Sequence, residues 1–138
     1  MTGVQTCALP ISALIIWQTG VNDGVNDVAL SRFETTLRST IDAVRRANVE
    51  LILVGQHYTA RLAENQHYMA IGRAMERVAR EKAIAFVDRF AAMRLLVQAR
   101  GKEDMLSDDN FHLNDNGYRC MAEHVGKMIM EGLRTGNM

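Results

Sequence analysis

Proline is almost absent from this sequence, which has a single one, Pro10, and only two cysteines, Cys7 and Cys120. Two cysteines so far apart make neither the disulfide framework of a small secreted domain nor the paired spacing of a zinc site. No apolar run approaches the roughly 20 residues that a membrane-spanning helix needs. The formal net charge is zero, with 16 basic and 16 acidic residues, so the charge indicates neither a nucleic-acid nor an anionic-membrane partner. These absences leave one globular domain, for which 138 residues suffice.

Three short apolar runs divide the sequence: ALIIWQ (Ala13–Gln18), ELILVG (Glu50–Gly55) and IAFVD (Ile84–Asp88). Each is too short for a typical helix, contains β-branched or aromatic side chains, and is apolar on both faces. Strands that are buried in a parallel sheet have this composition. Because a helix-length segment separates each run from the next, the pattern predicts an α/β fold with right-handed βαβ crossovers.

Apolar side chains recur at helical spacing between and after these runs. The stripes comprise Phe33, Leu37, Ile41 and Val44; then Ile71, Met75 and Val78; and finally Tyr118, Met121, Val125, Ile129 and Leu133. The motif SRFE has the form of a capping box, which predicts that the first helix starts at Ser31. Residues 89–101 predict a helix that ends at Gly101, and residues 102–115 predict a polar loop.

Polar residues suited to chemistry follow the first run, in QTGVND (Gln18–Asp23). In an open parallel sheet, ligands bind beyond the carboxyl ends of the strands, where this segment is expected. Gly20 allows a sharp backbone turn, and Asn22 offers a side-chain amide donor close to the strand end. The same residue types are common in ordinary turns, so the motif alone leaves both interpretations open.

A second polar segment, DDNFHLNDNGY (Asp108–Tyr118), leads into the last predicted helix. Asp109 and His112 are close enough in sequence for the carboxylate to hold the imidazole, which is the orienting half of a nucleophile–base–acid relay. The alternative is a polar loop in which Asn114 or Asp115 caps the helix and His112 faces solvent. The acidic residues around the histidine also suit a metal ion by residue type, but their spacing matches no familiar ligand pattern. We therefore predict no metal site.

Together, a G-x-N-D after a strand and a D-x-x-H before the last helix of an α/β chain resemble the SGNH hydrolases, or GDSL-type esterases and lipases. Gly20, Asn22 and Asp23 match one sequence block of that family, and Asp109 and His112 match another. The resemblance extends, in the family's order, from the first predicted strand to the last predicted helix.

The resemblance implies a three-layer, flavodoxin-like α/β fold and the hydrolysis of a small-molecule ester through an acyl-enzyme, without a metal or cofactor. It implies that His112 is the general base, that Asp109 orients it, and that Asn22 donates its amide to an oxyanion hole beside Gly20. A non-catalytic flavodoxin-like binding module is the alternative. The chain has neither the G-x-G-x-x-G motif nor the P-loop lysine that a phosphate-binding module would use.

No serine of the chain fits the nucleophile, which the family carries in a Gly-Asp-Ser turn after its first strand. Ser12 precedes the first predicted strand, Ser31 and Ser39 have no Gly-Asp context, and Ser107 shares the loop of His112. The first strand of this chain therefore resembles the family's third, and the family's strands 1 and 2 are missing. In a strand order of 2-1-3-4-5, the first strand of the chain would then lie at an exposed edge, which promotes association.

The first residues differ from the rest of the chain. TGVQTCALPI can be encoded by ACT GGA GTT CAG ACG TGT GCT CTT CCG ATC, which matches a widely used sequencing-library adapter. The segment also lacks the basic start and the apolar run of a secretory signal. We therefore expect residues 1–11 to be translated adapter and residues 12–138 to be the C-terminal part of one hydrolase domain. Localisation and oligomeric state stay open.

Further candidates flank these segments. His57, Tyr58 and Arg61 follow the second predicted strand, at the end of the sheet where the catalytic loops are expected. They either line a pocket for the acyl or leaving group or have structural or solvent-facing roles. Cys120 adjoins the third apolar stripe and is expected to pack in the core. Asp88, at the end of the third predicted strand, is expected to cap the helix that follows.

Overall fold

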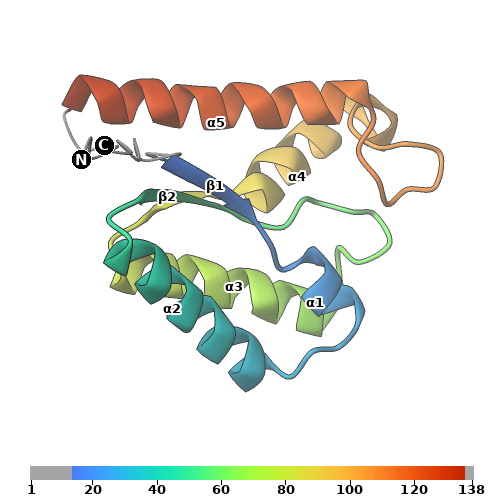
Figure 1. Cartoon of the computed structure of the whole chain (residues 1–138). Helices are drawn as coiled ribbons and strands as arrows, with labels where there is room; N and C mark the ends of the chain where they lie inside the picture. Colours follow the sequence, from blue (N-terminus) through green and yellow to red (C-terminus); the bar gives the residue numbers. More distant parts are fainter. Residues whose placement is uncertain (1–13, 136–138) are drawn as a thin grey trace, which may run out of the picture.

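Three parallel strands form the centre of the computed structural model, which describes residues 14–135 (Figure 1). They are β1 (Leu14–Gln18), β2 (Glu50–Val54) and β3 (Ala85–Val87), arranged in the order β1-β2-β3. Both pairs of neighbouring strands run parallel, and β2 is the central strand. The α/β fold with a parallel sheet, as predicted from the three apolar runs, is confirmed.

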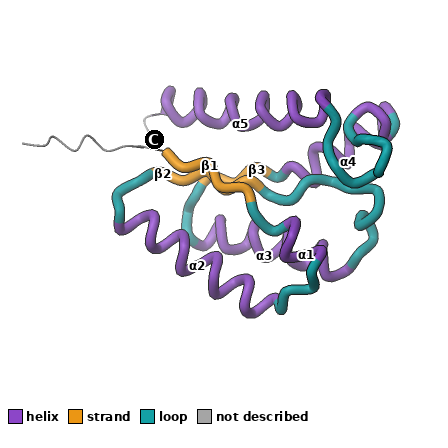
Figure 2. Tube along the Cα trace, turned by 45° about the vertical axis from the view of Figure 1, so that its right-hand side comes forward, coloured by secondary structure: helices purple, strands orange, loops and turns teal. Residues whose placement is uncertain are grey.

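Helices cover both faces of this sheet (Figures 1 and 2). The long helices α2 (Leu30–Arg46) and α3 (Gln66–Glu81) lie on one face, and α5 (Asp115–Thr135) lies on the other. α4 (Arg89–Arg100) follows β3 directly, and the short helix α1 (Val21–Val25) follows β1. The chain therefore has the three layers that a run of βαβ units produces.

Alternation along β2 explains why both faces are covered. Leu51 and Leu53 pack in the apolar cluster beneath α2 and α3. Ile52 and Val54 point to the other face, where they pack with Val125 of α5. Since successive side chains of a strand point to opposite faces, a strand that is apolar throughout must be buried on both sides.

The predicted stripes of α2 and α3 lie in the core. Five of their side chains are at most 1% exposed: Leu37, Ile41, Ile71, Met75 and Val78.

The stripe of α5 needs one correction, because Tyr118 is 53% exposed. One helical turn before Met121 lies Gly117, and it is Gly117 that faces inward. A Cβ atom on Gly117 would lie 2.4 Å from the carbonyl oxygen of Met105. The first turn of α5 therefore packs closely against the preceding loop through a residue without a side chain, which the apolar pattern could not reveal.

The predicted start of α2 is also wrong. The helix begins at Leu30, its N-cap is Ala29, and no side chain caps it. Val28 and Leu30 pack against the core cluster of α2 and α3. This packing draws the chain before Ser31 into the helix, so the serine lies inside the first turn.

Other predicted helix ends are confirmed. Asp88 caps α4, with its carboxylate accepting the backbone N–H of Ala91 at 3.0 Å. Gly101 ends α4 with a φ of 91°, a backbone conformation that favours glycine. Asn65, which the sequence did not single out, caps α3 by accepting the backbone N–H of Tyr68 at 2.8 Å.

β1 lies at an edge of the sheet, as predicted, since β2 is the strand that pairs with it among residues 14–135. Ile15 is 36% exposed and Ile16 is 50% exposed. The predicted adapter segment, residues 1–11, lies outside the described residues. No helix within the described part of the chain is both long and apolar enough to span a bilayer.

Candidate active site

The G-x-N-D segment leaves β1 through a left-handed turn at Gly20, whose φ is 90°. A Cβ atom on Gly20 would lie 2.6 Å from the Sδ of Met75, so both the backbone angle and the available space favour glycine. The carbonyl of Gly20 accepts the backbone N–H of Gly24 at 3.0 Å. The motif is thus a sharp turn, and that turn starts α1.

Asn22 lies in the first turn of α1, at the carboxyl end of β1, and is exposed. Its backbone carbonyl accepts the N–H of Asn26 at 2.9 Å. Its side-chain amide makes no hydrogen bond to any described residue. An exposed amide with both N–H groups unused can donate to a charge that develops on a bound substrate.

Asp109 and His112 are in direct contact. The Nδ1 of His112 lies 2.5 Å from the Oδ2 of Asp109. The other carboxylate oxygen, Oδ1, accepts the backbone N–H groups of Phe111 and His112, both at 2.9 Å. The carboxylate therefore orients the ring and also shapes the backbone that carries it.

These hydrogen bonds lower the pKa of Asp109 to about 2, chiefly through the bond from His112 and then through the two backbone N–H groups. The side chain is therefore ionised over the working range of most enzymes. Because an ionised carboxylate only accepts hydrogen bonds, the proton of a neutral His112 resides on Nδ1 and the lone pair on Nε2. The His112 side chain is 68% exposed, so Nε2 is available as a base.

The alternative predicted for this loop also holds in part. Asn114 caps α5, because its Oδ1 accepts the backbone N–H of Gly117 at 3.0 Å. The loop closes on itself through a bridge between Leu106 and Leu113 and through the N–H of Ser107, which donates to the carbonyl of His112 at 2.9 Å. A capping loop and an oriented histidine are therefore compatible.

The structure brings His57 and Arg61 next to this loop. His57 is buried, and its Nε2–H donates to the carbonyl oxygen of Phe111 at 2.8 Å. Burial lowers the pKa of His57, so the ring is neutral near pH 7. Arg61 is exposed, with its guanidinium 5.8 Å from the centre of the Phe111 ring. The rings of Phe111 and His112 in turn form a T-shaped pair, with ring centres 5.0 Å apart.

Tyr58 has a structural environment. Its side chain packs against the cluster of Met93 and Met105, and its ring lies 5.7 Å from that of Phe90. Cys120 packs against the same cluster, and burial raises the pKa of its thiol. A direct role of Tyr58 in a substrate pocket therefore stays a prediction.

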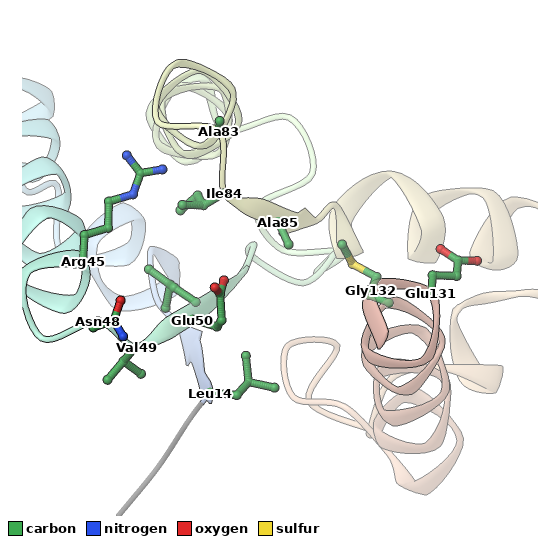
Figure 3. A pocket seen from close by; sticks show the side chains of 12 residues that line it. Leu14, Arg45, Asn48, Val49, Glu50, Ala83, Ile84, Ala85, Glu131 and Gly132 are labelled. Carbon is green, nitrogen blue, oxygen red and sulfur yellow. The ribbon is translucent and has the colours of Figure 1, made fainter. Parts of the chain in front are cut away.

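A hollow of about 660 Å³ lies at the opposite end of the sheet (Figure 3). Leu14, Glu50 and Ala85, which begin β1, β2 and β3, line it together with Arg45 and Glu131. Because ligands of parallel sheets bind at the carboxyl ends, this hollow is not the site that Asp109 and His112 would serve.

The described serines do not approach His112 as a nucleophile would. Ser31 and Ser39 lie on α2, and the hydroxyl of Ser107 donates to the carbonyl of Leu113 at 3.1 Å. Ser12 lies outside the described residues. Within the described ranges, no group of three or more His, Cys, Asp and Glu side chains lies close enough to hold a metal ion.

Two buried polar residues near the site escaped the sequence analysis. Gln56, two residues after the end of β2, is 3% exposed, and its Nε2 donates to the carbonyl of Gly20 at 3.0 Å. Arg89 is 2% exposed, and its Nε donates to the carbonyl of Gly55 at 3.0 Å. Burial lowers the pKa of Arg89 to about 10. The sequence offered one signal for both residues, because each follows a predicted strand. Polar residues at such positions lie at the carboxyl end of a parallel sheet, where ligands bind.

The fold is similar to that of several proteins of known structure. It matches the lipase/acylhydrolase from Enterococcus faecalis with a TM-score of 0.73 and 19% identity, covering 85% of this chain and 60% of that one. It matches Axe2, an acetylxylan esterase from Geobacillus stearothermophilus, with a TM-score of 0.70 and 20% identity, covering 81% and 57%. TesA matches with a TM-score of 0.66 and 23% identity, covering 83% and 61%.

The chain spans about three fifths of the length of these proteins, and at such identities the likeness shows the fold. Described catalytic mutants of Axe2 replace a serine and a histidine. Among curated protein sequences, none matches the chain significantly. The sequence pattern of the GDSL-like lipase/acylhydrolase family matches residues 5–120, which is most of the chain. The protein therefore belongs to the GDSL-like lipase/acylhydrolase family.

Proposed function

We propose that this chain carries the base, the orienting acid and an oxyanion donor of a carboxylic ester hydrolase. The observation that supports this most is the contact between Asp109 and His112, in which the carboxylate takes up Nδ1 and leaves Nε2 exposed. The family match supplies the reaction class. The side-chain amide of Asn22, which has no hydrogen-bond partner among residues 14–135, lies at the same, carboxyl end of the sheet.

In the proposed reaction, Nε2 of His112 takes the proton of a serine hydroxyl as the serine oxygen attacks the ester carbonyl. The carbonyl oxygen becomes an oxyanion, and Asn22 donates its amide N–H to it. The intermediate collapses when the imidazolium returns the proton to the leaving alcohol, which leaves an acyl-serine. Water then repeats the sequence with the same base and releases the carboxylic acid. Asp109 stays ionised and stabilises the imidazolium.

The nucleophile is the part of this machinery that the described residues do not supply. We therefore propose that the 138-residue chain on its own does not turn over esters. Loss of the nucleophile from a complete triad lowers turnover by about 10⁶-fold. An exposed imidazole without a serine would give slow hydrolysis that does not saturate with substrate. The acyl group and the alcohol that the family member would prefer depend on a pocket that these residues do not define.

Hydrolysis of p-nitrophenyl acetate tests the first part of this proposal. The parent chain should show no saturable turnover, and Ser107→Ala should match it. Saturable turnover by the parent that His112→Ala abolishes would show that a nucleophile is present and would contradict the proposed inactivity.

A chimera tests the roles of the residues. The amino-terminal segment of Axe2 that contains its catalytic serine would be joined before Leu14, in the frame given by the superposed folds. A fluorophosphonate probe should label the serine of a folded chimera, and both labelling and esterase activity should fall by at least about 10²-fold in His112→Ala. A similar drop is expected for Asn22→Ala, since losing one oxyanion donor costs about 10²–10³-fold. A folded chimera whose activity is insensitive to both changes would exclude the assigned roles.

A further inference from the structure

The segment Gly55–Thr59 leaves β2 and contacts both loops of the candidate site. Gln56 is 3% exposed, His57 is 7% exposed and Thr59 is fully buried. Burial of so many polar side chains is costly unless each one is hydrogen-bonded. Each of these three side chains donates a hydrogen bond to a backbone carbonyl of one of the two candidate loops, although the Nδ1 of His57 has no partner among the described residues. This arrangement carries the inference.

Gln56 bonds to the turn that carries the proposed oxyanion donor, Asn22. Its Nε2 donates to the carbonyl oxygen of Gly20 at 3.0 Å. A Cβ atom on Gly24 would lie 3.1 Å from the same Nε2, and one on Gly72 would lie 2.7 Å from the Oε1. The glutamine side chain therefore fills a space that three glycines, from the turn, from α1 and from α3, leave open.

His57 and Thr59 bond to the loop that carries the proposed base, His112. The Nε2–H of His57 donates to the carbonyl of Phe111 at 2.8 Å, and the hydroxyl of Thr59 donates to the carbonyl of Asn110 at 2.9 Å. These two carbonyls belong to the residues directly before His112. Both hydrogen bonds therefore restrain the backbone from which the catalytic imidazole would project.

The segment itself is fixed to the sheet. The N–H of Gly55 donates to the carbonyl of Val87 at 3.0 Å, and the carbonyl of Gly55 accepts the Nε of Arg89 at 3.0 Å. From this anchored segment, Gln56 reaches the Gly20 turn while His57 reaches the loop of His112.

We propose that Gly55–Thr59 is the positioning element of this site, in which Gln56 sets the place of the Gly20–Asn22 turn and His57 and Thr59 set the place of the His112 loop. This inference rests on the proposed function. Catalytic groups must be held within about 0.5 Å of their working geometry. A single anchored segment that bonds to both loops fixes the spacing between the oxyanion donor and the base.

Amide hydrogen exchange by NMR tests the oxyanion side without any substrate. Gln56→Met keeps the length of the side chain but removes the donor, so the N–H groups of Gly24 and Asn26 should exchange roughly two- to tenfold faster. Ile41→Val, a core change in α2, is the matched control. Once the change in global stability is taken into account, the exchange rates of both N–H groups should equal those of the parent. Equal exchange in Gln56→Met and the parent would overturn the assignment of Gln56.

The titration of Asp109 tests the side of the base, because its low pKa depends on the geometry of this loop. In His57→Leu, the carboxyl pKa measured by ¹³C NMR should move from about 2 toward its ordinary value of 3.8. His57→Gln, which keeps an N–H donor, should restore most of the shift. If His57→Leu does not fold, Thr59→Val is nearly isosteric and should give a smaller change in the same direction. A folded Leu or Val variant with an unchanged Asp109 titration would overturn the proposal.

Both measurements are independent of ester turnover. If the chimera never hydrolyses an ester, the proposed function is contradicted. The exchange and titration measurements would still test the positioning element. Conversely, an active chimera whose activity and loop exchange ignore Gln56→Met and His57→Leu would refute the positioning element alone.

Discussion

The Nδ1 of His112 lies 2.5 Å from the Oδ2 of Asp109, while the Oδ1 of the same carboxylate accepts the backbone N–H of His112 at 2.9 Å. One side chain thus holds both the ring and the main chain of the residue that it orients. Because the two residues are three apart, this orientation is encoded within a single loop.

Removal of this carboxylate should release the imidazole. In Asp109→Ala, neutral His112 should lose its preference for the proton on Nδ1, because the acceptor is gone. The ¹⁵N shifts of the ring nitrogens report the tautomer directly. Asp108→Ala, in the same exposed loop, is the control and should leave the shifts of His112 unchanged. Identical shifts in the parent and in Asp109→Ala would contradict the inferred proton position.

The turn before Asn22 should tolerate no side chain. Gly20→Ala places a Cβ in a left-handed backbone and against the Sδ of Met75, and should lower the free energy of unfolding by about 1–3 kcal/mol. Gly126→Ala is the matched control, since a Cβ there meets nothing within 4 Å in α5. It should raise the free energy of unfolding by about 0.5–1 kcal/mol. Urea denaturation of both variants checks the opposite signs.

The buried His57 should make stability depend on pH. Burial is the main cause that lowers its pKa below the ordinary value of 6.5. As the pH falls below 6.5, the unfolded chain takes up a proton at His57 before the folded chain does. The stability that the neutral, buried ring contributes at higher pH is therefore lost progressively, until the pH has passed through the pKa of His57 in the folded state. The free energy of unfolding should therefore fall as the pH decreases below about 6.5. His57→Gln should flatten this part of the profile, and equal slopes in the two proteins would contradict the prediction.

Helix caps give a second matched pair. Asn65→Ala removes the acceptor of the Tyr68 N–H at the start of α3, and should lower the free energy of unfolding by about 1 kcal/mol. Ser31→Ala should change it by less than about 0.5 kcal/mol, because Ser31 lies inside α2 and caps nothing. Thermal unfolding followed by circular dichroism compares the two. A larger loss of stability in Ser31→Ala would indicate that Ser31 does cap the helix, as the sequence motif predicted, and would contradict the structure at this point.

The open edge of β1 should promote association. Ile16 is 50% exposed there, and an uncovered strand edge offers N–H and C=O groups to another chain. Ile16→Lys should reduce concentration-dependent light scattering. Leu95→Lys removes a side chain that is 67% exposed on α4, away from this edge, and should have little effect. If the two variants reduce light scattering equally, the association depends on general surface hydrophobicity, which would contradict a specific role of the β1 edge.

Several features could be predicted because their causes are local. Continuous apolar runs indicated the buried strands, and repeats at helical spacing indicated the faces of α2 and α3. The errors also have identifiable causes. Ser31 failed as a cap because packing of Val28 and Leu30 extended the helix, and Tyr118 failed as a core residue because the inward position is Gly117.

The α/β class, the order of the elements and the pairing of Asp109 with His112 could be predicted from the sequence, because each depends on residues within one turn, strand or loop. The bonds of Gln56 to Gly20, 36 residues away, and of His57 to Phe111, 54 residues away, become visible in the folded chain. No periodicity marks such contacts, since they exist only when the sheet brings the carboxyl ends of its strands together. The spacing between the two halves of the candidate site is therefore a property of the fold.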